Sequence, residues 1–328
     1  KISRPLEEQM MVQAVGESIR TTATRLRRLQ LPALAALGLL LMVSISVALS
    51  TGSISIPVGE VLKGTATELE TTVFIEIRAP RVALAGFVGA ALALAGAVLQ
   101  GLFRNPLADP GLIGVSSGAA LGAIAMIVLG SALAIPPSVT PYALPLSAVT
   151  GALLVTVALY LFAAHYGQFS ILTVILVGIA INALASVGIG AFQYLSDDAQ
   201  LRTLIFWMMG SFGRATWETV VPAVLIMITA LAVLFRQARN LDRLQLGEAE
   251  ATHLGVDVKR TKRLIILTSA AAVGAGVSLS GIIGFVGLVV PHLARLILGS
   301  RHAVVLPSSL IIGATLLILA DLVSRTVV

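Results

Sequence analysis

The sequence predicts an all-α membrane protein that crosses the bilayer several times. Of its 328 residues, 57% are hydrophobic and only 12% are charged, which exceeds the apolar content of an ordinary soluble domain. No Asp, Glu, Lys or Arg occurs between Pro110 and Ser196. A charge at the bilayer centre costs at least about 2.5–3.5 kcal/mol, and helices satisfy their own backbone hydrogen bonds in lipid. This long stretch must therefore fold into several spanning helices.

Apolar runs of about 20 residues are long enough to cross a bilayer as helices, and nine such runs can be placed in the chain. A polar tail of residues 1–30 precedes them, and residues 31–328 form the predicted membrane domain. The predicted spans cover residues 31–50, 82–101, 112–130, 141–163, 171–193, 217–235, 264–280, 283–298 and 303–320.

The distribution of charge predicts the orientation. If the N-terminus lies in the cytoplasm, so do the loops 102–111, 164–170, 236–263 and 299–302. Together with the tail and Arg295 they hold 16 of the 22 Lys and Arg residues but only eight of the 16 acids. Lys and Arg concentrate on the cytoplasmic side of membrane proteins. The net charge of +6 therefore marks this face, and no nucleic-acid partner is needed to explain it.

Two stretches on the predicted outer side are more than short connections. Residues 51–77 end in a polar run. Residues 195–214 include an apolar segment, Leu201–Met209, that is too short to span and has Trp207 near its end. Because Trp favours the membrane–water boundary, we expect a short helix lying at the outer interface.

An internal repeat appears at a shift of 185 residues, which crosses an odd number of predicted spans and so inverts the second copy. Inverted repeats are typical of transporters, with the substrate route at the repeat interface. Chance matching of small residues is the alternative. The shift aligns Arg78 with Arg263, Gly89 with Gly274, Gly96 with Gly281, Pro106 with Pro291 and Gly114 with Gly299.

The longest charged loop between predicted spans is 236–263. A plain link between neighbouring helices needs only about 2–8 residues, and this loop is much longer. Gly247 is placed to end one short helix and Gly255 to cap a second. The loop therefore predicts a cytoplasmic projection of two helices that suits a partner protein, with a solvated connector as the alternative.

Several motifs resemble the permease subunits of bacterial iron-chelate, haem and cobalamin ABC importers, and the haemin permeases most of all. The first is Arg78-Ala-Pro-Arg81, followed by Asn105-Pro-Leu-Ala-Asp-Pro-Gly-Leu-Ile-Gly-Val-Ser-Ser-Gly118. The second is Asp197–Arg202 followed by Phe206–Ser211, and the third is the run Gly284–Arg295.

The resemblance implies a permease in the bacterial inner membrane that carries haem, or another iron chelate, into the cytoplasm. It implies a homodimer with the pathway between two copies, two ATPase subunits and a periplasmic binding protein. Siderophore and cobalamin permeases share the motifs and stay alternatives. The family has ten spans with both ends inside. Since nine are predicted here, we expect that a last helix is missing after Val328.

The chain itself is predicted not to be an enzyme and to hold no cofactor. It has no Gly-x-x-x-x-Gly-Lys-Ser/Thr loop to bind nucleotide phosphates, so ATP and magnesium would be bound by the partner ATPase. An ion-coupled secondary transporter is the alternative from another class. Such a carrier usually needs carboxylates within the membrane, and the charge-free centre of the sequence lacks them.

The resemblance assigns roles at both faces. Arg78, Arg81 and Arg325 would form ion pairs with acidic residues of the binding protein, and the alternative is that they reach toward lipid headgroups. The coupling contact with the ATPase would use residues of the long cytoplasmic loop. These are Gly247, Glu248, Leu254 and Gly255.

The predicted route and its cytoplasmic gate use polar and flexible side chains of the spans and loops. For the amides, the alternative is a hydrogen bond to a neighbouring helix; for the methionines, it is simple packing. No two histidines are placed to hold a metal, so haem would pass without strong ligation. The predicted route residues are Gln100, Asn105, Leu107, Ser170, Asn182, Met208 and Met209.

Overall fold

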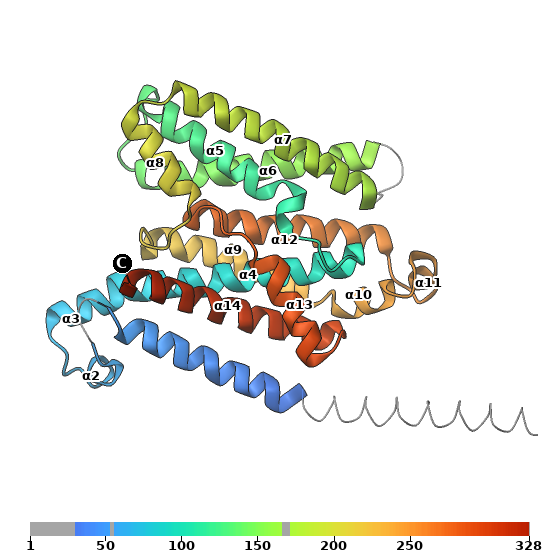
Figure 1. Ribbon diagram of the computed structural model, residues 1–328, viewed down its shortest axis with the longest axis horizontal. Coiled ribbons are helices and arrows are strands. Elements are labelled where there is room, and N and C mark those ends of the chain that lie inside the picture. The colour runs from blue at the N-terminus through green and yellow to red at the C-terminus, as the bar shows by residue number, and fades with distance from the viewer. Residues whose placement is uncertain (1–29, 53–55, 166–170, 328) are drawn as a thin grey trace, which may run out of the picture.

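The computed structural model describes residues 30–52, 56–165 and 171–327, which form helices and turns with no strand among them. The long helices run side by side (Figure 1). In chain order the elements are the first helix Gln30–Ser50, α2 Val58–Lys63, α3 Glu68–Thr72, η1 Val73–Arg78, α4 Ala79–Phe103, η2 Pro110–Ile113, α5 Val115–Leu129, η3 Gly130–Ala132, α6 Thr140–His165, α7 Ile171–Leu195, α8 Asp198–Met208, α9 Trp217–Phe235, α10 Ala238–Leu244, α11 Glu248–His253, α12 Val258–Ser280, α13 Val286–Leu298 and α14 His302–Val327.

The predicted all-helical membrane fold is confirmed. Within the described residues, eight helices are long and apolar enough to cross a membrane. The predicted eighth span, 283–298, is wrong in extent: α13 has 13 residues, and at 1.5 Å per residue it is only about 20 Å long. Residues 281–285 before it are not helical, because Gly281 and Phe285 both adopt a positive φ that ends regular helix.

Two predicted boundaries also need correction, because charged residues continue a helix beyond its apolar part. α12 begins at Val258, where Asp257 accepts a hydrogen bond from the Arg260 amide, so the loop predicted as 236–263 ends sooner. The second span belongs to a continuous helical stretch, Glu68–Phe103. Its segment η1 is a π-helix, a wide turn with i→i+5 hydrogen bonds.

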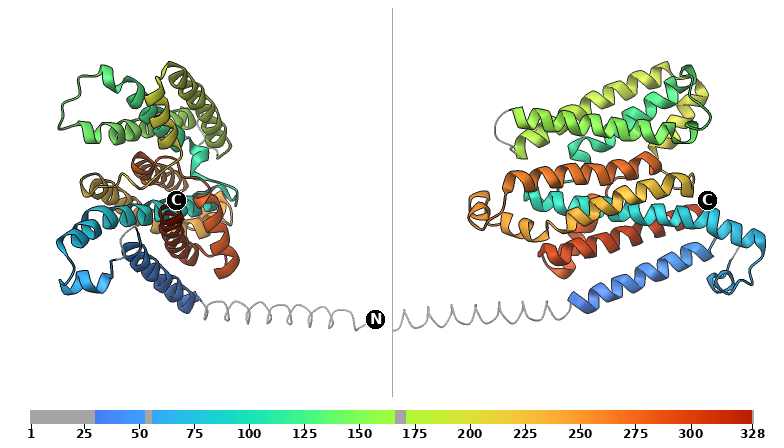
Figure 2. Two further views of the ribbon diagram at one scale, coloured as in Figure 1. Left: turned by 60° about the vertical axis from the view of Figure 1, so that its left-hand side comes forward. Right: turned by 180° about the vertical axis from the view of Figure 1, so that it is seen from behind.

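The helices form three layers (Figures 1 and 2). One layer holds α5, α6 and α7, the middle one holds α4, α9 and α12, and the third holds α13, α14 and the first helix. We call the end of the bundle with α10 and α11 the α11 end. The opposite end, with α2, α3 and α8, is the α3 end.

α4 is the centre of the packing. Its most apolar stretch is 83% buried, against 17% for that of α7. A Cβ added to Gly89 would lie 2.1 Å from the Gly313 carbonyl oxygen, and one added to Gly96 would lie 1.9 Å from that of Gly287. Small residues at these positions let the backbones of α13 and α14 touch α4 directly.

The inverted repeat has a counterpart in the arrangement. α4 runs from the α3 end to the α11 end and is followed by a broken segment and the shorter α5. α12 runs in the opposite direction and is followed by a broken segment and the shorter α13. The residue-by-residue pairing at a shift of 185 stays a prediction.

The short helix expected within 195–214 is confirmed as α8, but the expected setting of Trp207 is wrong. Its side chain is buried, with 3% exposed. The backbone of Gly281 lies against the Trp207 carbonyl: a Cβ at Gly281 would be 2.1 Å from that oxygen. The backbones of α8 and of the end of α12 are thus in contact, and the Trp207 side chain is part of the core.

Candidate functional site

Two of the three arginines predicted to dock a binding protein share one carboxylate at the α3 end. The Arg81 Nε donates to both oxygens of Asp321, at 3.0 and 2.9 Å, and its Nη2 donates to Oδ1 at 2.9 Å. The Arg325 Nε lies 3.8 Å from Oδ2 of the same group. The Asp321 side chain is only 5% exposed. Asp321 therefore joins the end of α14 to the start of α4.

The same arginines hold the end of the first helix. The Arg78 Nη1 donates to the carbonyls of Leu49 and Ser50, at 2.8 and 2.9 Å, and the Arg325 Nη2 donates to the carbonyl of Ala48. The last carbonyls of a helix have no partner within it and carry partial negative charge, so cations stabilise them. Arg78 and Arg325 thus fix the first helix to α4 and α14.

These contacts bear on the roles predicted for the three arginines. Arg78 is buried, so it does not reach toward lipid headgroups as the alternative supposed. Arg81 and Arg325 keep 23% and 12% of their side chains exposed. Their docking role stays a prediction, and it now falls on these two residues more than on Arg78. The ion pair between Arg81 and Asp321 could not be read from the sequence, because the two residues are 240 positions apart.

A second polar feature of the α3 end lies beside α8. A cavity of about 460 Å³ is lined by Thr203, Phe206, Met209, Gly210, Ser211 and Arg214. Met209, a predicted route residue, is 72% exposed there. Met208 instead packs against the core, which agrees with the packing alternative. The exposed Arg214 was not singled out from the sequence.

The turn between α4 and α5 carries two of the predicted gate residues on its surface. The Asn105 side chain accepts a hydrogen bond from the Leu107 amide at 2.9 Å, and both residues are exposed, with Leu107 at 71%. Asn105 therefore shapes the turn that presents Leu107. Ser170, the third predicted gate residue, lies outside the described residues.

The same turn is held against α7. Asp109 accepts a hydrogen bond from the Gly111 amide at 2.7 Å and caps η2. Burial raises the pKa of the Asp109 carboxyl, and the hydrogen bond from Gly111 opposes that shift. The Asn182 Nδ2 donates to the Gly111 carbonyl at 3.1 Å. Asn182 thus holds the turn in place, as the hydrogen-bonding alternative stated.

At the α11 end, the predicted coupling residues frame a single short helix. Gly247 and Gly255 have φ values of 131° and 83°, which L side chains rarely adopt, and they flank α11. The Glu248 Oε2 pairs with the Lys262 Nζ at 2.7 Å. Leu254 is 50% exposed. The expected two-helix projection is therefore present as α10 and α11.

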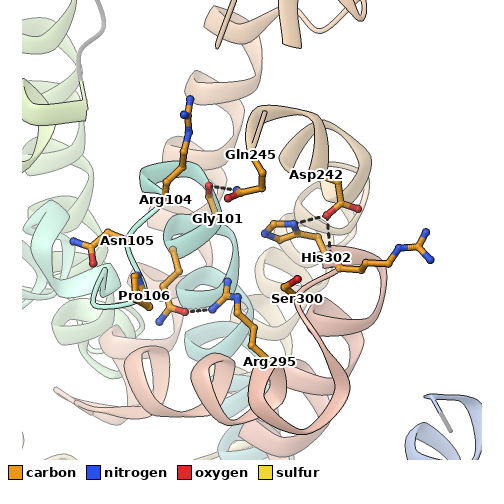
Figure 3. Close-up of a pocket in the computed structure, with 11 residues that line it drawn as sticks. Gly101, Arg104, Asn105, Pro106, Asp242, Gln245, Arg295, Ser300 and His302 are labelled. Atoms are coloured by element: carbon orange, nitrogen blue, oxygen red, sulfur yellow. Dashed lines mark hydrogen bonds and ion pairs between the residues drawn. The ribbon is translucent and has the colours of Figure 1, made fainter. Parts of the chain in front are cut away.

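α10 is tied to two long helices (Figure 3). The Gln245 Nε2 donates to the Gly101 carbonyl of α4 at 2.8 Å. The Asp242 Oδ1 accepts from the His302 amide at 3.0 Å and lies 2.7 Å from its Nδ1. α10, which adjoins α11 in the chain, is therefore joined to both α4 and α14.

Gln100 lies beside these contacts and is buried. Its Nε2 donates to the carbonyls of Gly287 and Leu288, at 3.3 and 3.1 Å, and its Oε1 accepts from Arg295. It also lines a cavity of about 670 Å³ at the α11 end. The side chain therefore joins α4 to α13 and borders the cavity. Among the described residues there is no group of three or more His, Cys, Asp or Glu that could hold a metal.

Comparisons with known proteins agree with this architecture. A model of the FecCD transport family matches residues 40–328. The hemin transport system permease protein HmuU of Yersinia pestis is 42% identical, over 89% of this chain and 87% of that protein. The vitamin B12 import system permease protein BtuC of Vibrio parahaemolyticus is also 42% identical, over 88% and 85%. The molybdate import system permease protein MolB of Haemophilus influenzae is 37% identical, over 88% and 86%.

A solved structure described as an inward-facing conformation of a metal-chelate type ABC transporter has the same fold. Its TM-score is 0.82 at 34% identity, and the match covers 90% of this chain and 91% of that one. The similarity therefore extends over nearly all of the described helices.

Proposed function

Since the chain belongs to the FecCD transport family and is the permease subunit of an ABC importer, we propose that it carries haem, or another iron chelate, across the bacterial inner membrane. The observation that supports haem is the 42% identity with a hemin permease over 89% of the chain. A vitamin B12 permease is equally similar in identity, so cobalamin is the second candidate.

We propose that the α11 end faces the cytoplasm and receives the ATPase. The excess of Lys and Arg in its loops supports this orientation, and it places the N-terminus inside. α11 is a short helix followed by the exposed Leu254, and it is tied through α10 to α4 and α14. In this proposal, a displacement of α11 by the ATPase is transmitted through α10 to the spanning helices α4 and α14.

We propose that the pathway lies between two copies of the chain. α7 exposes a row of large apolar side chains, which a second copy would cover. Leu172, Leu176, Leu184 and Val187 are 57–72% exposed. The substrate-binding protein would then approach the α3 end, where Arg81, Arg325 and Arg214 are accessible.

The test is transport by the full complex. The permease is reconstituted in proteoliposomes with its ATPase, and uptake is measured with the binding protein encoded beside it. Haem, cobalamin, a ferric siderophore and molybdate are offered separately. We expect ATP-dependent uptake of haem. Uptake of cobalamin without haem would replace the first candidate with the second, and uptake driven by an ion gradient without ATP would contradict the whole proposal.

A further inference from the structure

The cavity at the α11 end carries more positive charge than its own carboxylate balances. Arg104 follows the end of α4, Arg295 lies in α13 and Arg301 precedes α14, and all three line the cavity of about 670 Å³. Asp242 is the one acid in its lining, and it is bound to His302. Across the described ranges, no carboxylate forms an ion pair with any of the three arginines.

Arg295 shows this lack of compensation most clearly. Its Nη1 donates to the Gln100 side chain and its Nη2 donates to the Ala97 carbonyl at 3.1 Å. Both acceptors are neutral, and the guanidinium is only partly exposed. A guanidinium has five N–H donors in a fork that suits two oxygens of a phosphate or carboxylate. Arg295 therefore keeps donors for an anion that enters the cavity.

Arg104 is held in a backbone conformation that its side chain does not favour. Its φ is 49° and its ψ is 36°, in the left-handed region, where it caps the end of α4. This position usually carries Gly or Asn, and other L residues cost roughly 1–2 kcal/mol there. The side chain is exposed at the rim of the cavity. The end of α4 favours a cation, and at the rim of the cavity the side chain is also placed to contact an anionic ligand.

The position of the cavity points to lipid as the source of that anion. The cavity lies where α4 ends at Phe103, α13 ends at Leu298 and α14 begins at His302, which is the depth of the headgroups. Beside Arg295, α13 exposes Leu296 and Ile297, at 70% and 65%, as a surface for acyl chains. Arg295 is turned toward Gln100, whereas the Arg104 side chain stands at the rim and points away from Arg295 (Figure 3), so a ligand that contacts both must be larger than a small ion.

We propose that this cavity binds the phosphate headgroup of an anionic phospholipid from the leaflet at the α11 end, with Arg104 and Arg295 as its main contacts. Basic pockets between helices on the cytoplasmic side are suited to such headgroups. The bound lipid would sit against α10, whose Asp242 and Gln245 also line the cavity. The site does not depend on which cargo the permease carries.

The experiment measures lipid retention by the full chain, purified in mild detergent and examined by native mass spectrometry. Phosphatidylglycerol and phosphatidylethanolamine are added at equal concentration. We expect the wild type to retain phosphatidylglycerol at least about tenfold more strongly. Arg104→Gly and Arg295→Gln should each reduce that preference at least about threefold. The double change Lys259→Gln with Arg260→Gln removes two charges from the same end outside the cavity and should leave it unchanged.

Arg104→Gly keeps the test independent of folding, since glycine is at ease at a positive φ and the thermal stability of the delipidated protein should not fall. Equal retention of phosphatidylglycerol by the wild type, Arg104→Gly and Arg295→Gln would overturn the proposal. Inorganic phosphate is added in a separate arm. If it displaces the lipid at about 1 mM, the site is one for free phosphate, and the lipid assignment is wrong.

Discussion

Two sets of three arginines lie at opposite ends of this bundle and differ in what they bind. At the α3 end, Arg81 and Arg325 share the buried Asp321, and Arg78 and Arg325 hold the last carbonyls of the first helix. At the α11 end, Arg295 bonds only neutral acceptors, within the part of the chain that the structure describes.

The difference shows that the partners of an arginine matter more than its presence near a membrane surface. The α3-end arginines have acceptors within the chain, so their first effect is on helix packing. The α11-end arginines have few, so their effect should appear when a ligand or partner arrives. A charge change at the α3 end therefore tests the fold before it tests docking.

The largest expected effect comes from removing the shared carboxylate. Asp321→Ala leaves Arg81 without its two-oxygen partner in a mostly buried setting, and breaking a buried pair in this way costs about 3–5 kcal/mol. We expect the lower part of that range, because Arg81 is partly exposed, and a clear fall in thermal stability in detergent. Asp321→Asn keeps one acceptor and should cost less.

Arg202→Gln is the matched control for Asp321→Ala. Arg202 lies on α8 at the same end, is exposed and forms no ion pair among the described residues, so its loss should leave the stability unchanged. If the Asp321→Ala protein is as stable as the wild type, the ion pairs at the α3 end do not contribute to the stability of the fold, and the difference drawn between the two ends is wrong.

An intermediate effect is expected at the α11 end, where one ion pair resembles those of the α3 end. Lys262 is 7% exposed and pairs with Glu248, which is 45% exposed. Glu248→Gln leaves a buried ammonium with a weaker partner, at a cost of about 1–3 kcal/mol. We expect α11 to loosen, so that proteolysis within 247–255 becomes faster and stimulation of the ATPase by the binding protein declines.

Glu250→Gln serves as the comparison for Glu248→Gln. It removes the same charge from the same helix, and Glu250 forms no ion pair in the described ranges. If stimulation of the ATPase by the binding protein falls equally in both variants, the effect comes from the negative charge of α11 and not from the ion pair between Glu248 and Lys262.

The smallest expected effect is at Asp109, in the turn between α4 and α5. Asp109→Ala removes the cap from η2 at a cost of about 1 kcal/mol, whereas Asp109→Asn keeps it. Burial raises the pKa of Asp109 above its ordinary value of 3.8, so ionisation costs stability as the pH rises from 3.8 through the raised pKa. The advantage of Asn over Asp should grow across that window. Thermal unfolding of the two proteins at several pH values measures it, and a constant difference would contradict the assignment.

Much of the fold could be predicted because lipid imposes a simple pattern. The span predicted at 217–235 coincides with α9, and that predicted at 171–193 differs from α7 by two residues at its end. α13 was overestimated because residues 282–285 are as apolar as the helix that follows. Hydropathy reports where a segment lies, and it does not report whether the backbone there is helical.

The site was less predictable, because its key contacts join distant parts of the chain. Gln100 and Asn182 were predicted to line the route, and their hydrogen bonding was the alternative, which followed from the cost of an unpaired amide in an apolar setting. The ion pair between Arg81 and Asp321 could not be predicted in this way. Asp321 lies near the end of an apolar helix, and the sequence does not show which neighbouring helix its side chain faces. His302, which is buried against Gly101, was given no role from the sequence.

The wide turn at η1, Val73–Arg78, has a consequence for how the chain tolerates length changes. A π-helical turn holds one residue more than an α-helical turn. Deleting one residue from 73–77 would let the segment close as α-helix and leave the register of α4 intact. Because the wide turn accommodates the additional residue within one turn, α3 would keep nearly the same orientation about the axis of α4. A deletion inside α4 itself would instead rotate everything that precedes it by about 100°, so a one-residue deletion should be tolerated better at η1 than within α4.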